Sequence, residues 1–244
     1  MCELLAVAWP RPEPLGRIFP WAVELERLGI AGFGWGVAWL DGGRVKGYRN
    51  AGRLADDRDG RDRLANVHSR YALVHLRRPS KLSTIEIEDT QPFVSDDGSF
   101  GFCHNGMFEH HHELRPRFVE RLCGRADSEV GYCLFESLLS EGHRPSAALS
   151  DVHRQLCGLA NLAYRGQDGQ LLLYGGHPDN TLWSFRVDEA EMASTGLHSA
   201  DLSVFDLIFP AAVDRRPVGG TVVHLGHPAL DRGEVEPTVH ATAL

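Results

Sequence analysis

Cys2 is the residue of this sequence whose position gives it the clearest reactive chemistry. Cysteine is small enough that removal of the initiator Met1 is expected, and the chain would then begin with a thiol and a free α-amine on one residue. An α-amine has a pKa of ~7.7–8.0, so an appreciable fraction is an unprotonated base near neutral pH. A thiol beside that base suits nucleophilic acyl transfer, with the amine accepting the thiol proton directly or through a water. The alternative interpretation is an incidental cysteine at the start of a strand.

Arg77 and Asp127 carry charges that could bind a substrate with two opposite charges. Arg77 ends the H-x-R segment 75–77, directly after an expected apolar strand. A guanidinium there presents a planar fork that can bind a carboxylate through two hydrogen bonds. Asp127 opens the Asp-Ser-Glu run 127–129 and could bind an ammonium group. Each residue also has a simpler interpretation, Arg77 as half of a surface ion pair and Asp127 as the cap of the following helix.

Asn105 and Gly106 follow another expected strand, in the His-Asn-Gly segment 104–106. The Asn side chain donates an amide N–H, and Gly lets its main-chain N–H approach a substrate without a Cβ in the way. Such a pair could stabilise the oxyanion of a tetrahedral intermediate, where the loss of one donor typically costs ~2.7–4 kcal/mol. Asn-Gly is also the commonest hairpin turn, which is the structural alternative.

Hydrophobic patterning and turn signals place these residues on strands and helices that come in blocks. The expected strands are 4–9, 32–40, 44–48, 71–76, 100–103, 159–164, 170–174, 181–187 and 221–225. The expected helices are 19–28, 111–122, 147–156 and one that starts at 127–129, while 56–63 is a charged loop or helix. Gly42-Gly43 predicts a hairpin between two of the strands. This arrangement predicts an α+β fold, with packed sheets flanked by helices.

Composition favours one large domain over residues 2–244, with a tail after about residue 226 that lacks a clear period. A net charge of −8 argues against nucleic-acid and membrane-surface partners. No apolar run approaches the roughly 20 residues of a membrane helix, and no signal-peptide pattern is present. We therefore expect a cytoplasmic protein.

Neither a disulfide framework nor a metal site is expected. The five cysteines are odd in number and never stand as C-x-x-C, which favours reduced thiols. Three consecutive histidines, 110–112, suggest metal binding at first sight. Adjacent residues on a helix point in different directions, and no second cluster at ligand spacing accompanies them, so a solvated helix start is the preferred interpretation.

Cys2 and the segments 75–77, 104–106 and 127–129 together resemble the class II glutamine amidotransferases, the N-terminal-nucleophile hydrolases that begin with cysteine. The Gly-Trp-Gly run at 34–36 is similar to a segment of the stand-alone members. By motif the resemblance covers roughly residues 2–140. It implies a four-layer αββα sandwich. No cofactor is expected, because thiolate and amine chemistry uses neither a metal nor a nucleotide.

The resemblance also implies a role for each matching residue. Cys2 would attack the side-chain amide of glutamine or of a γ-glutamyl compound, giving a γ-glutamyl thioester that water then hydrolyses. Asn105 and Gly106 match the oxyanion hole, Arg77 the residue that binds the α-carboxylate, and Asp127 the residue that binds the α-ammonium. Ammonia would pass to a separate synthase subunit, or the substrate would be a larger γ-glutamyl amide that is simply hydrolysed.

Three departures from the family pattern concern the pocket walls. In the run Arg78-Pro79-Ser80 that follows Arg77, Pro79 stands where the family often has Ala and Ser80 where it often has Thr. Gln91 replaces a usual histidine, and Phe33 replaces an acidic residue. They leave the identity of the γ-glutamyl substrate open. Two alternatives also stay open: a non-catalytic amino-acid-binding regulatory subunit, and an N-terminal-cysteine acylase that acts on a non-glutamine amide.

Overall fold

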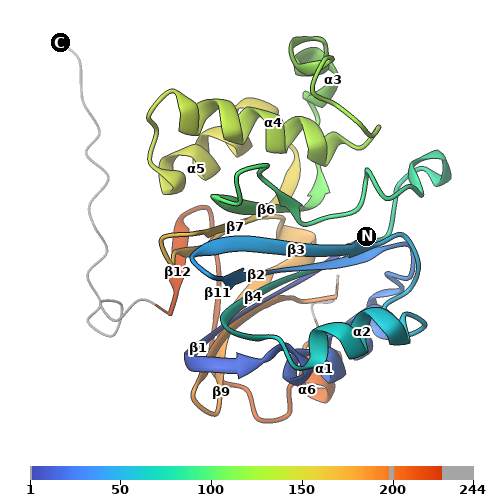
Figure 1. Ribbon diagram of the computed structural model, residues 1–244, viewed down its shortest axis with the longest axis vertical. Helices are drawn as coiled ribbons and strands as arrows, with labels where there is room; N and C mark the ends of the chain where they lie inside the picture. Colours follow the sequence, from blue (N-terminus) through green and yellow to red (C-terminus); the bar gives the residue numbers. More distant parts are fainter. Residues whose placement is uncertain (1, 198–200, 227–244) are drawn as a thin grey trace.

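A computed structural model of the chain describes residues 2–197 and 201–226, whose strands form two antiparallel sheets (Figure 1). The seven-stranded sheet has the order β11-β9-β10-β1-β4-β2-β3, with β1 (Glu3–Pro14), β2 (Trp35–Asp41), β3 (Arg44–Asn50), β4 (His68–Leu76), β9 (Leu182–Val187), β10 (Ala190–Thr195) and β11 (Val213–Pro217). The five-stranded sheet has the order β12-β8-β7-β6-β5, with β5 (Phe93–Val94), β6 (Phe100–Met107), β7 (Leu159–Gly166), β8 (Leu171–Gly176) and β12 (Val222–Leu225).

Helices cover the outer face of each sheet, so the described residues form four layers (Figure 1). The seven-stranded sheet carries α1 (Phe19–Gly29), α2 (Arg58–Ala65) and α6 (Ser203–Ile208). The five-stranded sheet carries α4 (Asp127–Ser140) and α5 (Pro145–Leu156), with the short α3 (His111–Leu114) beyond them. The predicted α+β class and its αββα layering are confirmed.

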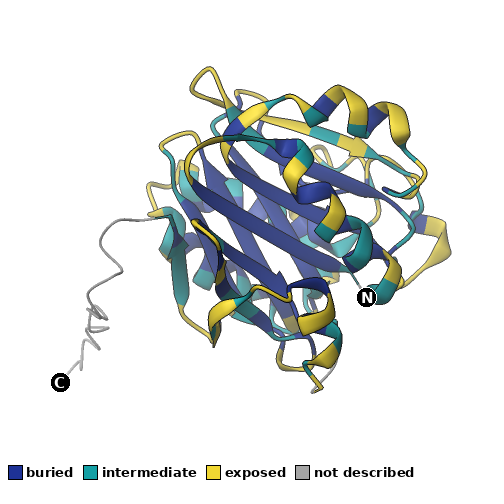
Figure 2. Cartoon of the chain, turned by 90° about the horizontal axis from the view of Figure 1, so that it is seen from below, coloured by how far each residue is buried: buried dark blue, intermediate teal, exposed yellow. Residues whose placement is uncertain are grey.

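Strand β1 shows how the sequence produces these layers, because both of its faces are buried. Leu5, Val7 and Trp9 pack in the apolar cluster beneath the helices of the seven-stranded sheet. Leu4 and Ala6 point the other way, into the cluster between the two sheets. Alternate side chains of a strand point to opposite faces, so a continuous apolar run serves two cores at once. Figure 2 shows the central strands of the molecule as largely buried, while exposed residues gather in loops and on the outer faces of helices.

Several expected elements form close to their predicted bounds, among them β4, β7, β9, α1 and α5. Gly42 and Gly43 make the hairpin between β2 and β3, with φ values of 56° and 76° that suit glycine. The charged stretch contains α2, which Asp57 caps by accepting a hydrogen bond from the Gly60 N–H at 2.9 Å.

Other predictions were wrong at the element boundaries. β1 does not end at Pro10 but continues to Pro14, because its pairing with β4 shifts register between Ala8 and Glu13 and resumes there. The helix expected over 111–122 is only α3, followed by the 3₁₀ turn Arg115–Phe118. α4 begins at Asp127, whose side chain does not cap it. Asn105-Gly106 lies inside β6, so it is not a hairpin turn.

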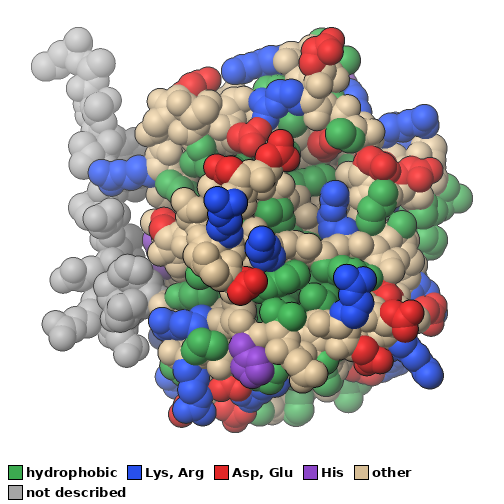
Figure 3. Space-filling model, in the orientation of Figure 1, with side chains coloured by type: hydrophobic (Ala, Val, Ile, Leu, Met, Phe, Trp, Pro, Cys, Tyr) green, Lys and Arg blue, Asp and Glu red, His purple; other side chains and the backbone are tan. Residues whose placement is uncertain are grey.

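The predicted extended tail falls on residues 227–244, outside the described residues. Among the helices of the described chain, none is long and apolar enough to cross a membrane. Acidic and basic side chains are interspersed on the face shown in Figure 3.

Candidate active site

Cys2 lies immediately before β1, the middle strand of the seven-stranded sheet. Glu3 pairs with Leu76 of β4, which brings Cys2 beside the segment that follows that strand. The Arg78 main-chain N–H donates to Cys2 Sγ at 3.4 Å, and Sγ lies 3.6 Å from the Arg78 carbonyl oxygen. Burial raises the pKa of the Cys2 thiol, while the Arg78 main chain and the Arg77 guanidinium act in the opposite direction.

Arg77 is buried, with 4% of its surface exposed, so the surface ion pair considered for it does not form. Its Nη2 donates to the Thr84 hydroxyl at 2.8 Å, while Nη1 has no hydrogen-bond partner in the described chain. Burial lowers the pKa of Arg77, and the nearby Asp89 and Asp127 carboxylates raise it. A buried cation with an unpaired N–H is costly unless a ligand completes its hydrogen bonds, and a carboxylate would do so.

Asn105 is fully buried in β6, directly across from Asn161 of β7. Its side-chain amide donates to the main-chain carbonyl oxygen of Cys2. Its Oδ1 accepts a hydrogen bond from Asn161 Nδ2 at 3.0 Å. The bond to Oδ1 fixes which end of the Asn105 amide faces Cys2, so that an N–H donor is presented beside the thiol-bearing residue.

Gly106 has a φ of 136°, which disfavours any residue with a side chain. A Cβ added there would lie 1.8 Å from the Leu159 carbonyl oxygen. Both observations show that this position needs glycine. The close approach is that of β7, because the nearest atoms that the Cβ would meet all belong to Leu159 and Ala160.

Asp127 is the first residue of α4, and its Oδ2 accepts a hydrogen bond from the Phe108 main-chain N–H at 2.8 Å. Its other carboxylate oxygen makes no hydrogen bond within the described chain, so it can accept one from a ligand. Phe108 comes two residues after Gly106, so its bond to Asp127 links the start of α4 to the end of β6. The carboxylate of Asp127 therefore lies at the same end of the sandwich as Asn105 and Gly106.

Three polar residues that the sequence did not single out support this site. Asp89 Oδ1 accepts from the main-chain N–H groups of Arg125 and Ala126, at 2.6 and 2.7 Å, and so holds the segment before Asp127. Asn161 holds Asn105. Glu3 is fully buried behind Cys2, where its Oε2 accepts from the Thr195 hydroxyl and Oε1 has no partner in the described chain. Burial raises the pKa of Glu3 to about 8.

Gln91, one of the departures from the family pattern, braces the strand that carries Asn105. Its Oε1 accepts from the His104 N–H at 2.6 Å, and its Nε2 donates to the His104 carbonyl oxygen at 3.0 Å. One amide side chain thereby satisfies both main-chain groups of a buried residue. Gln91 thereby helps to fix the backbone of β6 next to Asn105.

The five residues predicted for the site therefore gather at one end of the sandwich, around the start of β1. Cys2 contacts Asn105 through a hydrogen bond, and the charges of Cys2 and Asp127 both act on Arg77. Among the described residues, no group of three or more His, Cys, Asp or Glu side chains could hold a metal ion. The arrangement offers a thiol, N–H donors beside it, a buried cation and an anion, which is what acyl transfer from a zwitterionic amino acid requires.

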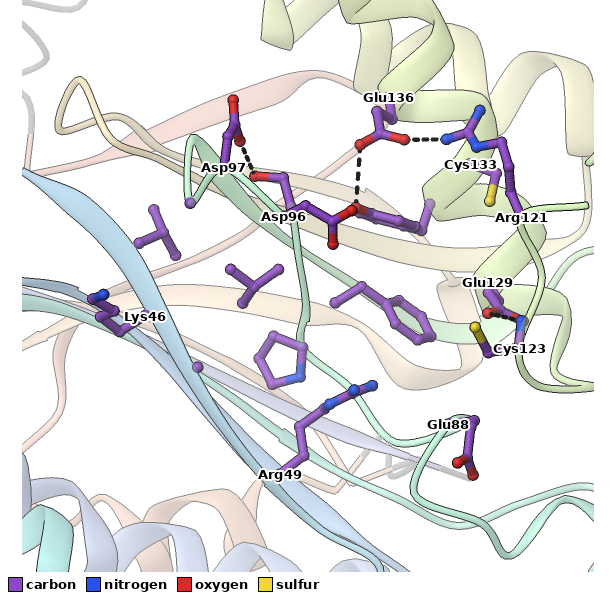
Figure 4. Close-up of a pocket in the computed structure, with 18 of the residues that line it drawn as sticks. Lys46, Arg49, Glu88, Asp96, Asp97, Arg121, Cys123, Glu129, Cys133 and Glu136 are labelled. Carbon is purple, nitrogen blue, oxygen red and sulfur yellow. Dashed lines mark hydrogen bonds and ion pairs between the residues drawn. The ribbon is translucent and has the colours of Figure 1, made fainter.

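A cavity of about 720 Å³ lies between β3, β5 and α4, away from Cys2 (Figure 4). Basic side chains such as Lys46, Arg49 and Arg121 share it with acidic ones such as Glu88 and Glu136. None of the five predicted site residues lines it. The largest described cavity and the predicted site are therefore different places.

Comparison with known proteins decides the family. The family model described as glutamine amidotransferases class-II matches residues 1–204. The chain belongs to the class-II glutamine amidotransferases. No sequence among the curated proteins matches this one.

Solved structures support the fold of this class-II chain. A glutamine phosphoribosylpyrophosphate amidotransferase from B. subtilis superposes with a TM-score of 0.68 at 16% identity, over 91% of this chain and 48% of that one. A predicted glutamine amidotransferase from Pseudomonas aeruginosa matches with a TM-score of 0.53 at 13% identity, over 92% and 97%. A glutamine aminotransferase class-II domain protein from Silicibacter pomeroyi gives 0.55 at 19% identity, over 80% and 88%. The chain thus spans about half the length of the first relative and nearly all of the other two.

Proposed function

We propose that this chain hydrolyses the side-chain amide of glutamine or of a γ-glutamyl compound through a thioester on Cys2. The observation that carries the proposal is the buried guanidinium of Arg77, whose Nη1 has no partner in the described chain and whose charge acts on Cys2. A γ-glutamyl substrate would supply the missing carboxylate and carry its amide toward the thiol. Family membership supports the same reaction class.

The predicted site residues can carry out each step of this reaction. After removal of Met1, the Cys2 α-amine takes the thiol proton and Sγ attacks the amide carbon. The Asn105 side chain and the Gly106 main-chain N–H stabilise the negative charge on the amide oxygen. Collapse of the tetrahedral intermediate breaks the C–N bond, and the protonated amine gives its proton to the departing nitrogen. Water then attacks the thioester to release glutamate and the thiol.

The released nitrogen has two possible destinations. As ammonia it passes to water or to a separate synthase subunit, and as a substituted amine it is itself the product. Arg77 and Asp127 bind the α-carboxylate and the α-ammonium in either case. The fixed part of the substrate is therefore the γ-glutamyl group.

The first test is glutamate release from L-glutamine by protein whose intact mass shows that Met1 is absent. Release that disappears in Cys2→Ala establishes both the nucleophile and the half-reaction. A control with Cys157→Ala, which changes a cysteine of similar partial exposure, leaves activity intact. No Cys2-dependent release from glutamine or from any γ-glutamyl amide would sink the proposal and favour the regulatory-subunit alternative.

A further inference from the structure

A surface depression of about 480 Å³ lies beside the nucleophile. Its wall includes Arg78, whose main-chain N–H is 3.4 Å from Cys2 Sγ. Ligand pockets in proteins typically enclose ~300–1,000 Å³, so the depression has room for a substantial chemical group. The residues that line it are Leu28, Gly29, Ile30, Arg78, Pro79, Ser80 and Leu197.

Arg77 and Arg78 direct their side chains to opposite sides of the segment that lies beside Cys2. Hydrogen bonds from Arg77 N to Gly34 O and from Phe33 N to Arg77 O, at 2.7 and 3.0 Å, continue the pairing of β4 with β2. In such extended backbone, successive side chains point to opposite sides. The Arg77 side chain is buried in the predicted glutamate site, while Arg78 is exposed and lines the depression. The acyl part of a substrate and its leaving group therefore have different environments.

Four of the seven lining residues are apolar, namely Leu28, Ile30, Pro79 and Leu197, and two of these have unusual backbone conformations. Ile30, at the end of α1, has a φ of 55° and is 61% exposed. Leu197 has a φ of 59°. The left-handed region is unfavourable for residues with bulky side chains, where glycine or asparagine is usual. Ile30 takes this conformation as the C-cap residue of α1, where its N–H donates to the Glu26 carbonyl oxygen. Ile30 and Leu197 both border the one depression beside Cys2.

We propose that the depression binds an apolar substituent on the nitrogen of the scissile amide. The preferred substrates are then γ-glutamyl alkyl or aryl amides, and glutamine itself is a poorer substrate. This inference rests on the proposed function. The amide carbon must come within about 3–3.5 Å of Sγ for attack, so a substituent on its nitrogen extends toward whichever wall lies beside the thiol. The departures at Pro79 and Ser80 form part of that wall.

The test compares kcat/KM for L-glutamine, γ-glutamyl propylamide and γ-glutamyl 2-hydroxyethylamide, using protein without Met1. All three give the same thioester. The propylamide and the hydroxyethylamide are also nearly isosteric secondary amides, so the ratio between these two reports recognition of the leaving group. The propylamide should exceed glutamine by at least about tenfold, and should exceed its hydroxyl isostere by about threefold or more. Ile30→Asn, which suits the left-handed backbone but removes the apolar group, should lower the ratio of propylamide to hydroxyethylamide.

Two controls separate the outcomes. Val119→Asn, at an exposed apolar residue outside the depression, leaves the ratio unchanged. Leu197→Asn should lower the ratio of propylamide to hydroxyethylamide, as Ile30→Asn does. If one of these two variants fails to fold, the other still tests the inference. Equal kcat/KM for the three amides, with Cys2-dependent glutamate release retained, overturns this inference and leaves the proposed function standing. Absence of Cys2-dependent release from all three overturns both.

Discussion

Asn161 stands directly opposite Asn105 across the β6–β7 ladder and donates its Nδ2 to Asn105 Oδ1 at 3.0 Å. The same Nδ2 donates to the Asn180 carbonyl oxygen at 2.8 Å, and Asn161 Oδ1 accepts from the His177 N–H at 3.2 Å. A fully buried amide with these bonds has one orientation. The direction of the Asn105 amide is therefore set by the neighbouring strand.

Asn161→Ala should lower kcat by about tenfold while KM for the amide substrate stays nearly constant. The reason is that Asn105 keeps its place but loses the bond that orients its N–H toward the oxyanion, a donor whose full loss costs ~10²–10³ in kcat. Steady-state kinetics of both single variants and of the Asn105→Ala/Asn161→Ala double variant checks this. The double variant should be no worse than Asn105→Ala, and additive losses would mean that Asn161 acts independently of Asn105.

Arg77→Ala should reduce kcat/KM for L-glutamine by roughly 10- to 150-fold, the range expected for a lost charge-assisted hydrogen bond. With 4-aminobutanamide, which lacks the α-carboxylate, the same variant should lose little. Asp127→Asn should show the matching pattern with glutaramate, which lacks the α-ammonium. The measurement is kcat/KM for each enzyme with each compound. Equal losses on glutamine and on its truncated analogue would show that the charge does not bind the assigned group.

Glu3→Gln should change how stability depends on pH. Burial raises the pKa of Glu3 from 4.5 to about 8 in the folded chain, so between these values the folded state keeps a proton that the unfolded state loses. The contribution of Glu3 to stability is then fully present below pH 4.5 and is lost as the pH rises through 8, at up to ~1.4 kcal/mol per pH unit.

Urea unfolding at pH 5, 6.5 and 8 measures this effect. Glu3→Gln keeps an oxygen for the Thr195 hydroxyl but cannot ionise, so it should gain stability over the natural chain as the pH rises. Glu120→Gln, at an exposed residue, serves as the control. Parallel pH profiles for the natural chain and Glu3→Gln would contradict the assignment.

Gly106→Ala should destabilise the fold and abolish activity, whereas Gly169→Ala should be tolerated better. Both glycines have positive φ, at 136° and 93°, so both substitutions carry backbone strain of about 1–3 kcal/mol. Only at Gly106 does the new Cβ also meet a main-chain oxygen, at 1.8 Å, since nothing lies within 4 Å at Gly169. Comparing the thermal unfolding of the two variants separates the cost of the clash with the Leu159 carbonyl oxygen from the cost of the backbone strain. Equal loss of stability in both variants would show that the backbone shifts and removes the clash.

The sequence predicted the strands whose pattern is set locally and missed those that depend on their neighbours. The β2–β3 hairpin follows from two glycines at the turn, and β1 follows from an apolar run. β10 was missed because its short sequence has weak patterning, although it pairs with both β1 and β9. The helix expected to reach residue 122 ended early, where a 3₁₀ turn containing Pro116 follows α3.

The candidate site could also be predicted only where its residues stand in a local sequence pattern. Cys2, Asn105, Gly106, Arg77 and Asp127 stand in short motifs whose chemistry is readable one segment at a time. Glu3, Asp89 and Asn161 are single polar residues in stretches with no motif. Their importance comes from burial beside residues far away in sequence, as where Asp89 holds Arg125 and Ala126, and no local pattern encodes that.

The place of β1 between β4 and β10 also constrains when the site can exist. Leu5 pairs with Val74 on one side and with Ser194 on the other, so the strand beside the nucleophile is completed by residues made near the opposite end of the described chain. Contacts so distant in sequence form slowly and late in folding. A ribosome-bound chain that has not yet emerged beyond β10 therefore carries Cys2 without one of the two strands that flank β1, and the site beside the thiol can assemble only after β10 has been made.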